Sequence, residues 1–522
     1  MRKEILELIR QKGILLEKEL FDVLDNCEDV SVASGLLDNF EKVSGQKIIT
    51  IASLSKNYEF VREVVKELPG EMKKSVEKIF VKMGLNLEIK KESSVENKDD
   101  NPSRQKDINY KVFYSTHDNT KKIGVGDFVG HFRARYQQLQ GILVQRQGLT
   151  NLTSINKIPP GNRSSFTIIG IVSEKRMTKN KNLIITLEDL TGSLSVLVKA
   201  GSESFVAASE LQLDDVVAVK CSGNRELAFA FEIIYPDCFL PYKTKFDEDI
   251  SIAFISDIHV GSSNHLKEEF ENFIYWLGSD NEIAKKIKYL FVVGDNVDGV
   301  GIYPGQEKNL EVVGLEEQYS FLAKYLKKMP EHLTIFICPG QHDSVRIPEP
   351  QPIIDNHYGS SLHELPNVVL VSNPSIVKLL EGDKEFKVFM YHGGSIHTFI
   401  NEIEELRLMK AHSTPAKAGR HMLKRRHLAP MHGVSPQIVY VPNSEKDPLV
   451  ISEVPDVLCM GEVHRVDVEK YNGVLILTCG CWQSQTDYEE KLGNFPDPCK
   501  VPVLNLKTHE LKILDFSKGE DE

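Results

Sequence analysis

The 522-residue sequence lacks any uninterrupted apolar run of about 20 residues, the length that a membrane-spanning helix needs. It also lacks the apolar core of a signal peptide, since the first residues, Met1–Glu4, lead into a charged amphipathic pattern. We therefore expect a cytoplasmic protein that does not associate with a membrane. The length is enough for two or three domains.

The sequence also has fewer basic than acidic residues. The formal net charge is −12 at pH 7. A chain that wraps nucleic acid over its whole surface is normally basic, so this class of protein is excluded. Any contact with DNA must come from a local basic patch or from a partner protein.

No CxxC pair occurs among the eight cysteines, most of which lie inside apolar runs, as Cys338 and Cys459 do. Free buried cysteine behaves as a small hydrophobic residue, so the pattern favours core packing. Cys479 and Cys481 alternate along a predicted strand and would share one face. A zinc site or a disulfide is the alternative for that pair.

Three segments are predicted from composition alone. Residues 1–90 have leucines at helical spacing and predict a helical N-terminal module, with Leu15, Leu16, Leu20 and Leu24 as its clearest repeat. Residues 91–107 carry Lys, Glu, Asp, Asn and Ser and cannot bury enough apolar surface to offset the entropy of ordering, so they predict a flexible charged linker. Residues 517–522 predict an acidic tail.

Residues 108–248 predict an amphipathic helix followed by a barrel. Phe128–Leu143 places aromatic and aliphatic residues at helical spacing. From Ser165 the apolar period changes to two, and five short strands follow, which is typical of an OB-fold β-barrel. Phe229 and Phe231 share one face of the last strand, and we expect that face to be the core. With few other aromatic residues to stack bases, docking of a protein is favoured over binding of single-stranded nucleic acid.

Residues 249–516 alternate strands with helices. Five apolar strands each end in polar residues of metal-binding type, within Ser256–His259, Gly294–Gly299, Pro339–Asp343, Tyr391–Gly393 and Gly461–His464. Open α/β sheets bind their ligands at the carboxyl ends of the strands. The fold class is therefore a multi-domain α+β protein: a helical module, an OB-fold barrel and an α/β domain.

The polar residues at these strand ends indicate a metal site only when they are taken together. A single Asp-x-His after a strand is common and is a weak signal, but five in series supply more ligands than one ion needs. Two divalent ions roughly 3.5–4 Å apart, sharing a carboxylate, would use all of them and could clamp both oxygens of a phosphoryl displacement. The aspartates, the histidines and the extra carboxylate are hard and borderline ligands suited to Mn²⁺, Fe²⁺ or Zn²⁺.

The same motifs resemble those of the calcineurin-like metallophosphoesterases. Narrower segments resemble the small, exonuclease subunits of archaeal family D DNA polymerases, namely Gly294–Gly299, Pro339–Asp343 with Arg346–Pro352, Tyr391–Ser395, Leu423–Pro430 and Gly480–Thr486. The resemblance covers roughly residues 108–516. It implies a calcineurin-like α/β sandwich over residues 249–516.

The resemblance also implies roles for individual residues. Asp295 would bridge two metal ions. The first ion would be held by Asp257, His259 and His464, and the second by Gln341, His392 and Glu462. His342 would sit beside the scissile phosphate as general acid or transition-state donor, and Asp343 would orient His342.

Two positions depart from the family pattern. Gln341 stands where an asparagine is usual, and Glu462 stands where a histidine is usual. Both residues are among the ligands that the resemblance implies for the second ion. The added carboxylate favours a hard divalent ion, so two Mn²⁺ or Mg²⁺ ions are expected, with Fe²⁺ or Zn²⁺ as alternatives; the two changes could equally weaken activity.

The clearest basic patch is Arg407–His427, which holds seven Lys or Arg residues and no acidic residue. We predict that its DNA-contacting residues are Arg420, Lys424, Arg425 and Arg426, with a merely solvated segment as the alternative. Pro415–Gly419 within it predicts a flexible element.

The resemblance implies the small subunit of a two-subunit archaeal replicative DNA polymerase, with 3′–5′ exonuclease (proofreading) activity. The implied partners are the large catalytic subunit and DNA, and the sliding clamp is a further candidate. Two alternatives remain: a scaffold subunit with a weakened metal site, and a phosphoesterase for another phosphodiester.

Overall fold

The computed structural model describes residues 110–114, 123–161, 163–431 and 440–517, together with isolated positions before residue 50. The predicted linker, nearly all of the predicted helical module and the tail beyond Ser517 lie outside these residues. At the isolated positions, β1 (Leu15–Leu16) pairs in parallel with β2 (Ile48–Ile49). The helix prediction is therefore wrong at Leu15 and Leu16. All described residues from 110 onward belong to one compact unit, Lys106–Glu522.

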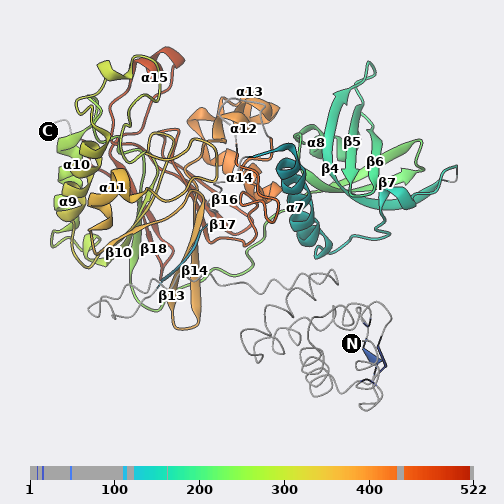
Figure 1. Cartoon of the computed structure of the whole chain (residues 1–522), viewed down its shortest axis with the longest axis horizontal. Helices are drawn as coiled ribbons and strands as arrows, with labels where there is room; N and C mark the ends of the chain where they lie inside the picture. The colour runs from blue at the N-terminus through green and yellow to red at the C-terminus, as the bar shows by residue number, and fades with distance from the viewer. Residues whose placement is uncertain are drawn as a thin grey trace. The chain divides into compact units, whose positions relative to one another are not determined.

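Two six-stranded mixed sheets form the larger part of this unit (Figure 1). The first has the order β12-β11-β10-β9-β18-β19, with bounds Val368–Leu370, Thr334–Cys338, Ile287–Val293, Ser251–Ile255, Lys500–Asn505 and Leu511–Asp515. The second has the order β16-β17-β15-β14-β13-β3, with bounds Asp467–Tyr471, Val474–Thr478, Val457–Met460, Lys384–Met390, Ser375–Glu381 and Tyr110–Tyr114.

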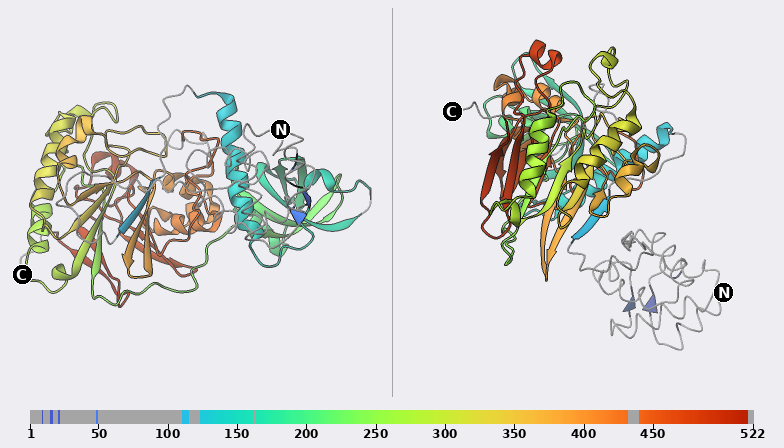
Figure 2. Two further views of the ribbon diagram at one scale, coloured as in Figure 1. Left: turned by 60° about the horizontal axis from the view of Figure 1, so that its bottom comes forward. Right: turned by 90° about the vertical axis from the view of Figure 1, so that its left-hand side faces the viewer.

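The two sheets pack face to face through a single apolar core, to which both contribute, for example Phe291 of β10 and Val388 of β14. Helices cover the outer faces (Figure 2). On the first sheet lie α9 (Lys267–Leu277), α10 (Leu315–Lys327) and α11 (Asn356–His363); on the second lie α12 (Ile396–Glu402) and α14 (Ala416–Arg425). The inner strands β9, β10, β11 and β15 are nearly continuous runs of apolar residues because both of their faces are buried.

The domain boundary predicted between residues 248 and 249 does not hold for one strand, which precedes it in the sequence but belongs to the α/β sandwich. β3 lies before the barrel in the sequence, yet it pairs antiparallel with β13 at the edge of the second sheet, with Val112 opposite Val377. The segment 108–248 is therefore shared between the barrel and the α/β sandwich.

The five strands predicted after Ser165 form a closed barrel in the order β4-β5-β6-β8-β7. Their bounds are Ser164–Met177, Leu183–Asp189, Gly192–Val198, Ala228–Ile234 and Val216–Gly223, with α8 (Glu203–Ser209) between β6 and β7. The predicted amphipathic helix is α7 (Val125–Val144), whose Tyr136, Leu139 and Leu143 pack on β4 and β7.

Phe229 and Phe231 do not lie in the barrel core. Their side chains are 38% and 50% exposed, while Ala228 and Ala230 face inward. The alternation along β8 was correct, but the assignment of faces was wrong. The small alanines fit the interior because large aliphatic residues of the other strands already fill it.

The predicted flexible element at Pro415–Gly419 is instead the start of helix α14. A side chain at Gly419 would lie 2.6 Å from Ile476 and 2.8 Å from Met460, so the helix packs closely on the second sheet. The described cysteines are free and buried, which agrees with core packing. In the described part of the chain, no helix is long and apolar enough to cross a membrane.

Candidate metal centre

The residues predicted to bind metals come from strands whose carboxyl ends meet at one edge of the sandwich. The three neighbouring parallel strands β9, β10 and β11 lead into Asp257, Asp295 and Gln341, and the parallel pair β14 and β15 leads into His392 and Glu462. Parallel neighbours end together, so side chains that are far apart in sequence converge there. His259 and His464 follow two residues after Asp257 and Glu462.

The backbone at these positions is strained. Five of the seven predicted ligands have a positive φ between 47° and 71°, namely Asp257, His259, Asp295, Glu462 and His464. Such a conformation costs of order 1–3 kcal/mol for a residue other than glycine, and it persists where the surroundings enforce it. Here the amide of Asp257 donates to the carbonyl of Gly294, and that of His259 donates to the carbonyl of Asp295, at 3.0 and 3.1 Å.

Three glycines leave room for the converging side chains. A Cβ on Gly340 would lie 2.2 Å from Asp295 Oδ1, and one on Gly294 would lie 2.2 Å from His392 Nδ1. A Cβ on Gly461 would lie 2.7 Å from Asp257 Oδ2. Any larger residue at these three positions would collide with a predicted ligand.

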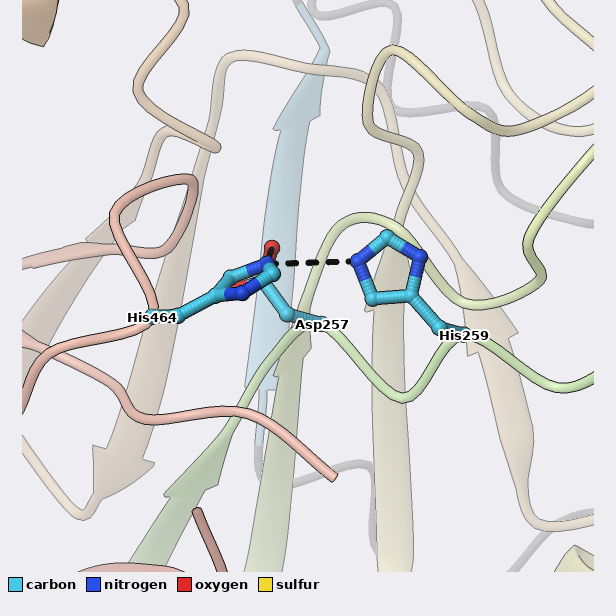
Figure 3. A group of neighbouring side chains, drawn as sticks. All are labelled: Asp257, His259 and His464. Carbon is cyan, nitrogen blue, oxygen red and sulfur yellow. Dashed lines mark hydrogen bonds and ion pairs between the residues drawn. The ribbon is translucent and has the colours of Figure 1, made fainter. Parts of the chain in front are cut away.

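The first group of ligands is Asp257, His259 and His464 (Figure 3). The Nε2 atoms of the two histidines face each other at 3.3 Å. Each Nδ1 atom contacts a carboxylate. Asp298 Oδ1 lies 3.1 Å from His259 Nδ1, and Glu489 Oε1 lies 2.9 Å from His464 Nδ1. Asp257 Oδ1 lies 3.4 Å from His464 Nε2 and is buried without a hydrogen-bond partner.

The second group surrounds Asp295. Its Oδ2 atom lies 3.3 Å from His392 Nε2, which in turn lies 3.1 Å from Glu462 Oε2. His392 Nδ1 bonds the carbonyl of Val293 at 2.8 Å, so Nε2 is the nitrogen turned toward the site. Gln341 Nε2 donates to Glu462 Oε2 at 2.9 Å. All four predicted residues of this group are therefore brought together.

Charge in the site is balanced between carboxylates and imidazoles. Burial disfavours the ionised carboxylate of Asp295, but the charges of His392 and His342 outweigh it and hold the pKa of Asp295 well below its usual range. Burial likewise disfavours the imidazolium of His392, but Asp295 and Glu462 raise the pKa of His392 well above its usual range. The pKa of His464 is also raised well above its usual range, against burial, by Cys481 and Asp257.

This donor set fits divalent metal ions. The ligand atoms of Asp257, His259 and His464 lie within 4.8 Å of one another, and so do those of Asp257, Asp295 and His392. Two buried atoms that face the site, Asp257 Oδ1 and His392 Nε2, make no hydrogen bond of normal geometry in the described structure, although each lies within ion-pair distance of another predicted ligand. Buried polar atoms are normally satisfied, so both are available to bind a cation.

His342 lies beside this set, but Asp343 does not orient it. His342 Nδ1 donates to the carbonyl of Asp298 at 2.7 Å. Asp343 turns away and accepts hydrogen bonds from the backbone of Gly340, from Asn296 and from the Tyr319 hydroxyl. The prediction that Asp343 orients His342 is therefore wrong. Burial and the charge of Asp295 raise the pKa of Asp343 to about 6.

Two residues of the site were missed by sequence reasoning. Asp298 bonds His259 through its side chain and His342 through its carbonyl, and with both histidines it forms a third cluster of potential ligands. It stands inside the Gly294–Gly299 motif, so a signal existed. Glu489 has no such signal, because it reaches His464 from the first turn of α15 (Asp487–Leu492), 25 residues along the chain.

The structure does not place two of the predicted DNA-contacting residues on the surface. Arg425 and Arg426 are 2% and 6% exposed. Arg425 pairs with Asp215 of the barrel at 3.1 Å, and Arg426 donates to the carbonyls of Ile451 and Ser452 at 2.6 Å. Both guanidinium groups are used inside the fold, so the prediction of DNA contact is wrong for these two.

The other two basic residues are partly exposed and also paired. Lys424 lies 2.5 Å from Glu210 of the barrel, and Arg420 lies 3.4 Å from Glu405 and 3.6 Å from Glu469. The end of α14 thus joins the sandwich to the barrel. Contact of Arg420 and Lys424 with DNA stays a prediction.

Comparison with known proteins places the chain in a family. Residues 252–467 match the family model for the B subunits of DNA polymerases alpha and epsilon. A DNA polymerase II small subunit from Methanothermobacter thermautotrophicus is 36% identical over 421 residues, which cover 79% of this chain and 84% of that protein. The chain belongs to the family of archaeal DNA polymerase II small subunits. The resemblance to a small subunit of an archaeal DNA polymerase is thereby confirmed.

Other members are similarly close. The small subunit from Pyrococcus horikoshii is 32% identical over 97% of this chain and 80% of its own length. The one from Pyrococcus furiosus is 37% identical over 76% of this chain, and the match spans only 64% of its length. Among solved structures, a protein described as a novel archaeal phosphodiesterase aligns with a TM-score of 0.25 at 12% identity; the alignment covers 51% of this chain and 99% of that protein.

Proposed function

We propose that the chain is a 3′–5′ exonuclease that hydrolyses phosphodiester bonds at DNA 3′ ends with two divalent metal ions, as the proofreading subunit of a two-subunit DNA polymerase. The position of Asp295 carries this proposal. Its Oδ2 atom faces His392 Nε2 at 3.3 Å on one side and His259 Nε2 at 4.0 Å on the other. A carboxylate between two groups of ligands is what a bridged pair of ions needs.

The ligands divide between two ions. Asp257, His259 and His464 would hold the first. Gln341, His392 and Glu462 would hold the second, and the carboxylate of Glu462 favours Mn²⁺ or Mg²⁺ there. When bound, such ions supply an activated water and stabilise the charge on both oxygens of the displacement.

His342 is the residue we assign to proton donation. Its Nδ1 bonds the carbonyl of Asp298, which can only accept, so Nδ1 carries a proton and Nε2 is the atom on the site side. Nε2 lies 4.0 Å from Asp295 Oδ2, and the side chain is 21% exposed. In the imidazolium form it would donate a proton to the leaving 3′-oxygen.

The barrel and the family names support the wider assignment. The closed order β4-β5-β6-β8-β7, with α8 before the fourth strand, is consistent with an OB-fold. The relatives are named small subunits, which implies a large catalytic subunit, and we propose that this chain docks with one. Because its net charge is −12, the isolated chain should hold duplex DNA weakly at physiological salt. The sliding clamp remains a further candidate partner.

One contact favours the alternative of a scaffold subunit with a weakened site. Gln341 Nε2 donates to Glu462 Oε2 at 2.9 Å, so the two departures from the family pattern satisfy each other. An amide and a carboxylate that hydrogen-bond each other do not need a metal ion to satisfy these polar atoms. The other alternative, a phosphoesterase for another phosphodiester, leaves the barrel without a role.

A nuclease assay separates these functions. The chain, alone and with its large subunit, is incubated with Mn²⁺ and with single-stranded, matched or mismatched DNA 3′ ends. The proposal predicts weak degradation of short single-stranded ends by the isolated chain, and faster, mismatch-preferring degradation by the complex. No degradation by either would favour the scaffold, and cleavage confined to small phosphodiesters would favour the other alternative.

A further inference from the structure

The outer surface of the barrel carries an apolar row that crosses its strands. On β5 and β6, Ile184 pairs with Leu197, and on β8 Leu197 pairs with Phe229. Paired residues on neighbouring strands share a face and lie about 5 Å apart. Phe231, two residues further along β8, points to the same side and is 50% exposed. We call Ile184, Leu197, Phe229 and Phe231 the outer apolar row.

Basic side chains surround this row. Arg176 of β4 pairs with Ile184, and the β4–β5 turn adds Lys179 and Lys181. Lys199 directly follows β6, and Arg225 lies in the β7–β8 turn. All five of these residues are exposed.

The local charge is opposite to that of the whole chain. No acidic residue occurs between Glu174 and Glu188, or between Asp189 and Glu203, and these two segments supply β5, β6 and the turn before β5. The β7–β8 side adds two exposed acidic residues, Glu226 and Glu232, of which Glu232 pairs with Lys220 at 2.7 Å. Glu174 does pair with Arg176 at 3.3 Å, but that pair is more than half exposed on both sides and contributes little. A cationic rim on a protein of net charge −12 selects an anionic partner.

Exposed aromatic rings beside basic side chains suit a ligand that has both flat bases and phosphates. We propose that this face, formed by β5, β6 and β8, binds single-stranded DNA, with bases stacked on Phe229 and Phe231 and phosphates on the lysines of the β4–β5 turn and Lys199. Successive rings at i and i+2 lie about 7 Å apart, so two separate bases can be stacked. Barrels of the OB type bind oligonucleotides on their second and third strands and on the turns after the first and fourth, which here are β5, β6 and the two basic turns.

A protein partner is the alternative occupant of this face, and substitutions of Phe229 and Phe231 distinguish a protein from single-stranded DNA. Leucine keeps most of the apolar area of phenylalanine but has no π-face. A protein interface therefore tolerates Phe→Leu far better than base stacking does. Both side chains are exposed, so substituting them should leave the barrel core of Ala228, Ala230 and their neighbours intact.

The test measures binding of the full chain to a fluorescent dT oligomer of about 20 nucleotides by anisotropy. EDTA is present, so that an active metal centre cannot degrade the probe. Loss of one stacked base weakens binding roughly 5- to 150-fold. We therefore expect the double variants Phe229→Ala/Phe231→Ala and Phe229→Leu/Phe231→Leu to bind at least about 10-fold more weakly. Tyr275→Ala, an exposed ring on α9, is the matched control and should bind as the native chain does.

The cationic rim is tested in the same assay. Lys179→Gln/Lys181→Gln/Lys199→Gln should weaken binding and flatten its dependence on salt concentration. Unchanged dT affinity in both double variants would overturn the proposal. A double-leucine variant that binds dT normally would also overturn it. So would double variants that bind dT normally but no longer bind the large subunit, because the face would then be a protein-docking surface. Because the readout is binding without divalent ions, it does not depend on the proposed nuclease activity.

Discussion

Glu462 Oε2 lies 3.1 Å from His392 Nε2, at the position where the family pattern has a histidine. Burial disfavours the Glu462 carboxylate, yet His392 and His397 lower the pKa of Glu462, so it is ionised at neutral pH. The substitution therefore brings a negative charge into a site that already contains Asp257 and Asp295. Its effect should be seen in which metal ion the site selects.

Replacing Glu462 tests this directly. If two Mn²⁺ ions bind as proposed, Glu462→Ala should remove one of them, and Glu462→His should keep both sites while shifting preference from Mn²⁺ toward Zn²⁺. Metal content after dialysis against mixed ions, measured by mass spectrometry, is the readout. Glu490→Ala, an exposed acidic residue on α15, is the control. Unchanged stoichiometry in Glu462→Ala would place Glu462 outside the coordination shell.

His342→Ala should separate catalysis from metal binding. His342 is anchored through Nδ1 to Asp298, and we assign its Nε2 to the leaving group. We expect turnover to fall roughly 10²- to 10⁴-fold, the usual cost of losing a general acid, with both ions retained. Single-turnover nuclease rates and metal content, measured on the same preparation, check this. Loss of the ions would make His342 a ligand instead.

Arg425→Ala should destabilise the protein. The guanidinium pairs with Asp215, and both side chains are 1% exposed. Removing one partner leaves a buried charge uncompensated, which typically costs about 3–5 kcal/mol. We expect a clearly lower midpoint of thermal unfolding, while Arg407→Ala, an exposed change in the same basic segment, should leave it unchanged. An unshifted midpoint for Arg425→Ala would show that the pair does not stabilise the joint between barrel and sandwich.

Metal binding should weaken as the pH falls. An imidazole binds a metal only when it is neutral. Burial lowers the pKa of both histidines, but neighbouring carboxylates raise the pKa of His392 well above its usual range. Cys481 and Asp257 do the same for the pKa of His464. Protons therefore compete with the ions at a higher pH than they would at an ordinary histidine. Calorimetric titration with Mn²⁺ in buffers of different ionisation enthalpy should show proton release and an affinity that falls from pH 8 to pH 6. A pH-independent affinity would contradict this.

The strand ends of the α/β domain could be predicted from the sequence because each motif follows an apolar run, and parallel strands end together. The five strands of the barrel were predictable from their period of two. Which face of β8 points inward was not, because Phe229 and Ala228 differ in size and the space left by the other strands decides between them. Arg425 and Arg426 show the same limit: a run of basic residues does not reveal Asp215, more than 200 residues away in sequence.

Contacts across loops were also beyond sequence reasoning. Asp343 follows His342 directly, yet its partners are Gly340, Asn296 and Tyr319. The support of His464 by Glu489 depends on where α15 begins. Such pairs depend on the path of the backbone between them.

We propose that Asp295 joins two metal ions in one active site. Asp295→Asn removes the charge but keeps the shape of the side chain, and its metal content and 3′-end nuclease activity can be measured together on the full chain. We expect two Mn²⁺ ions per native chain, fewer than two in Asp295→Asn, and loss of 3′–5′ degradation in the variant. An Asp295→Asn chain that keeps both ions and degrades 3′ ends at the native rate would contradict it.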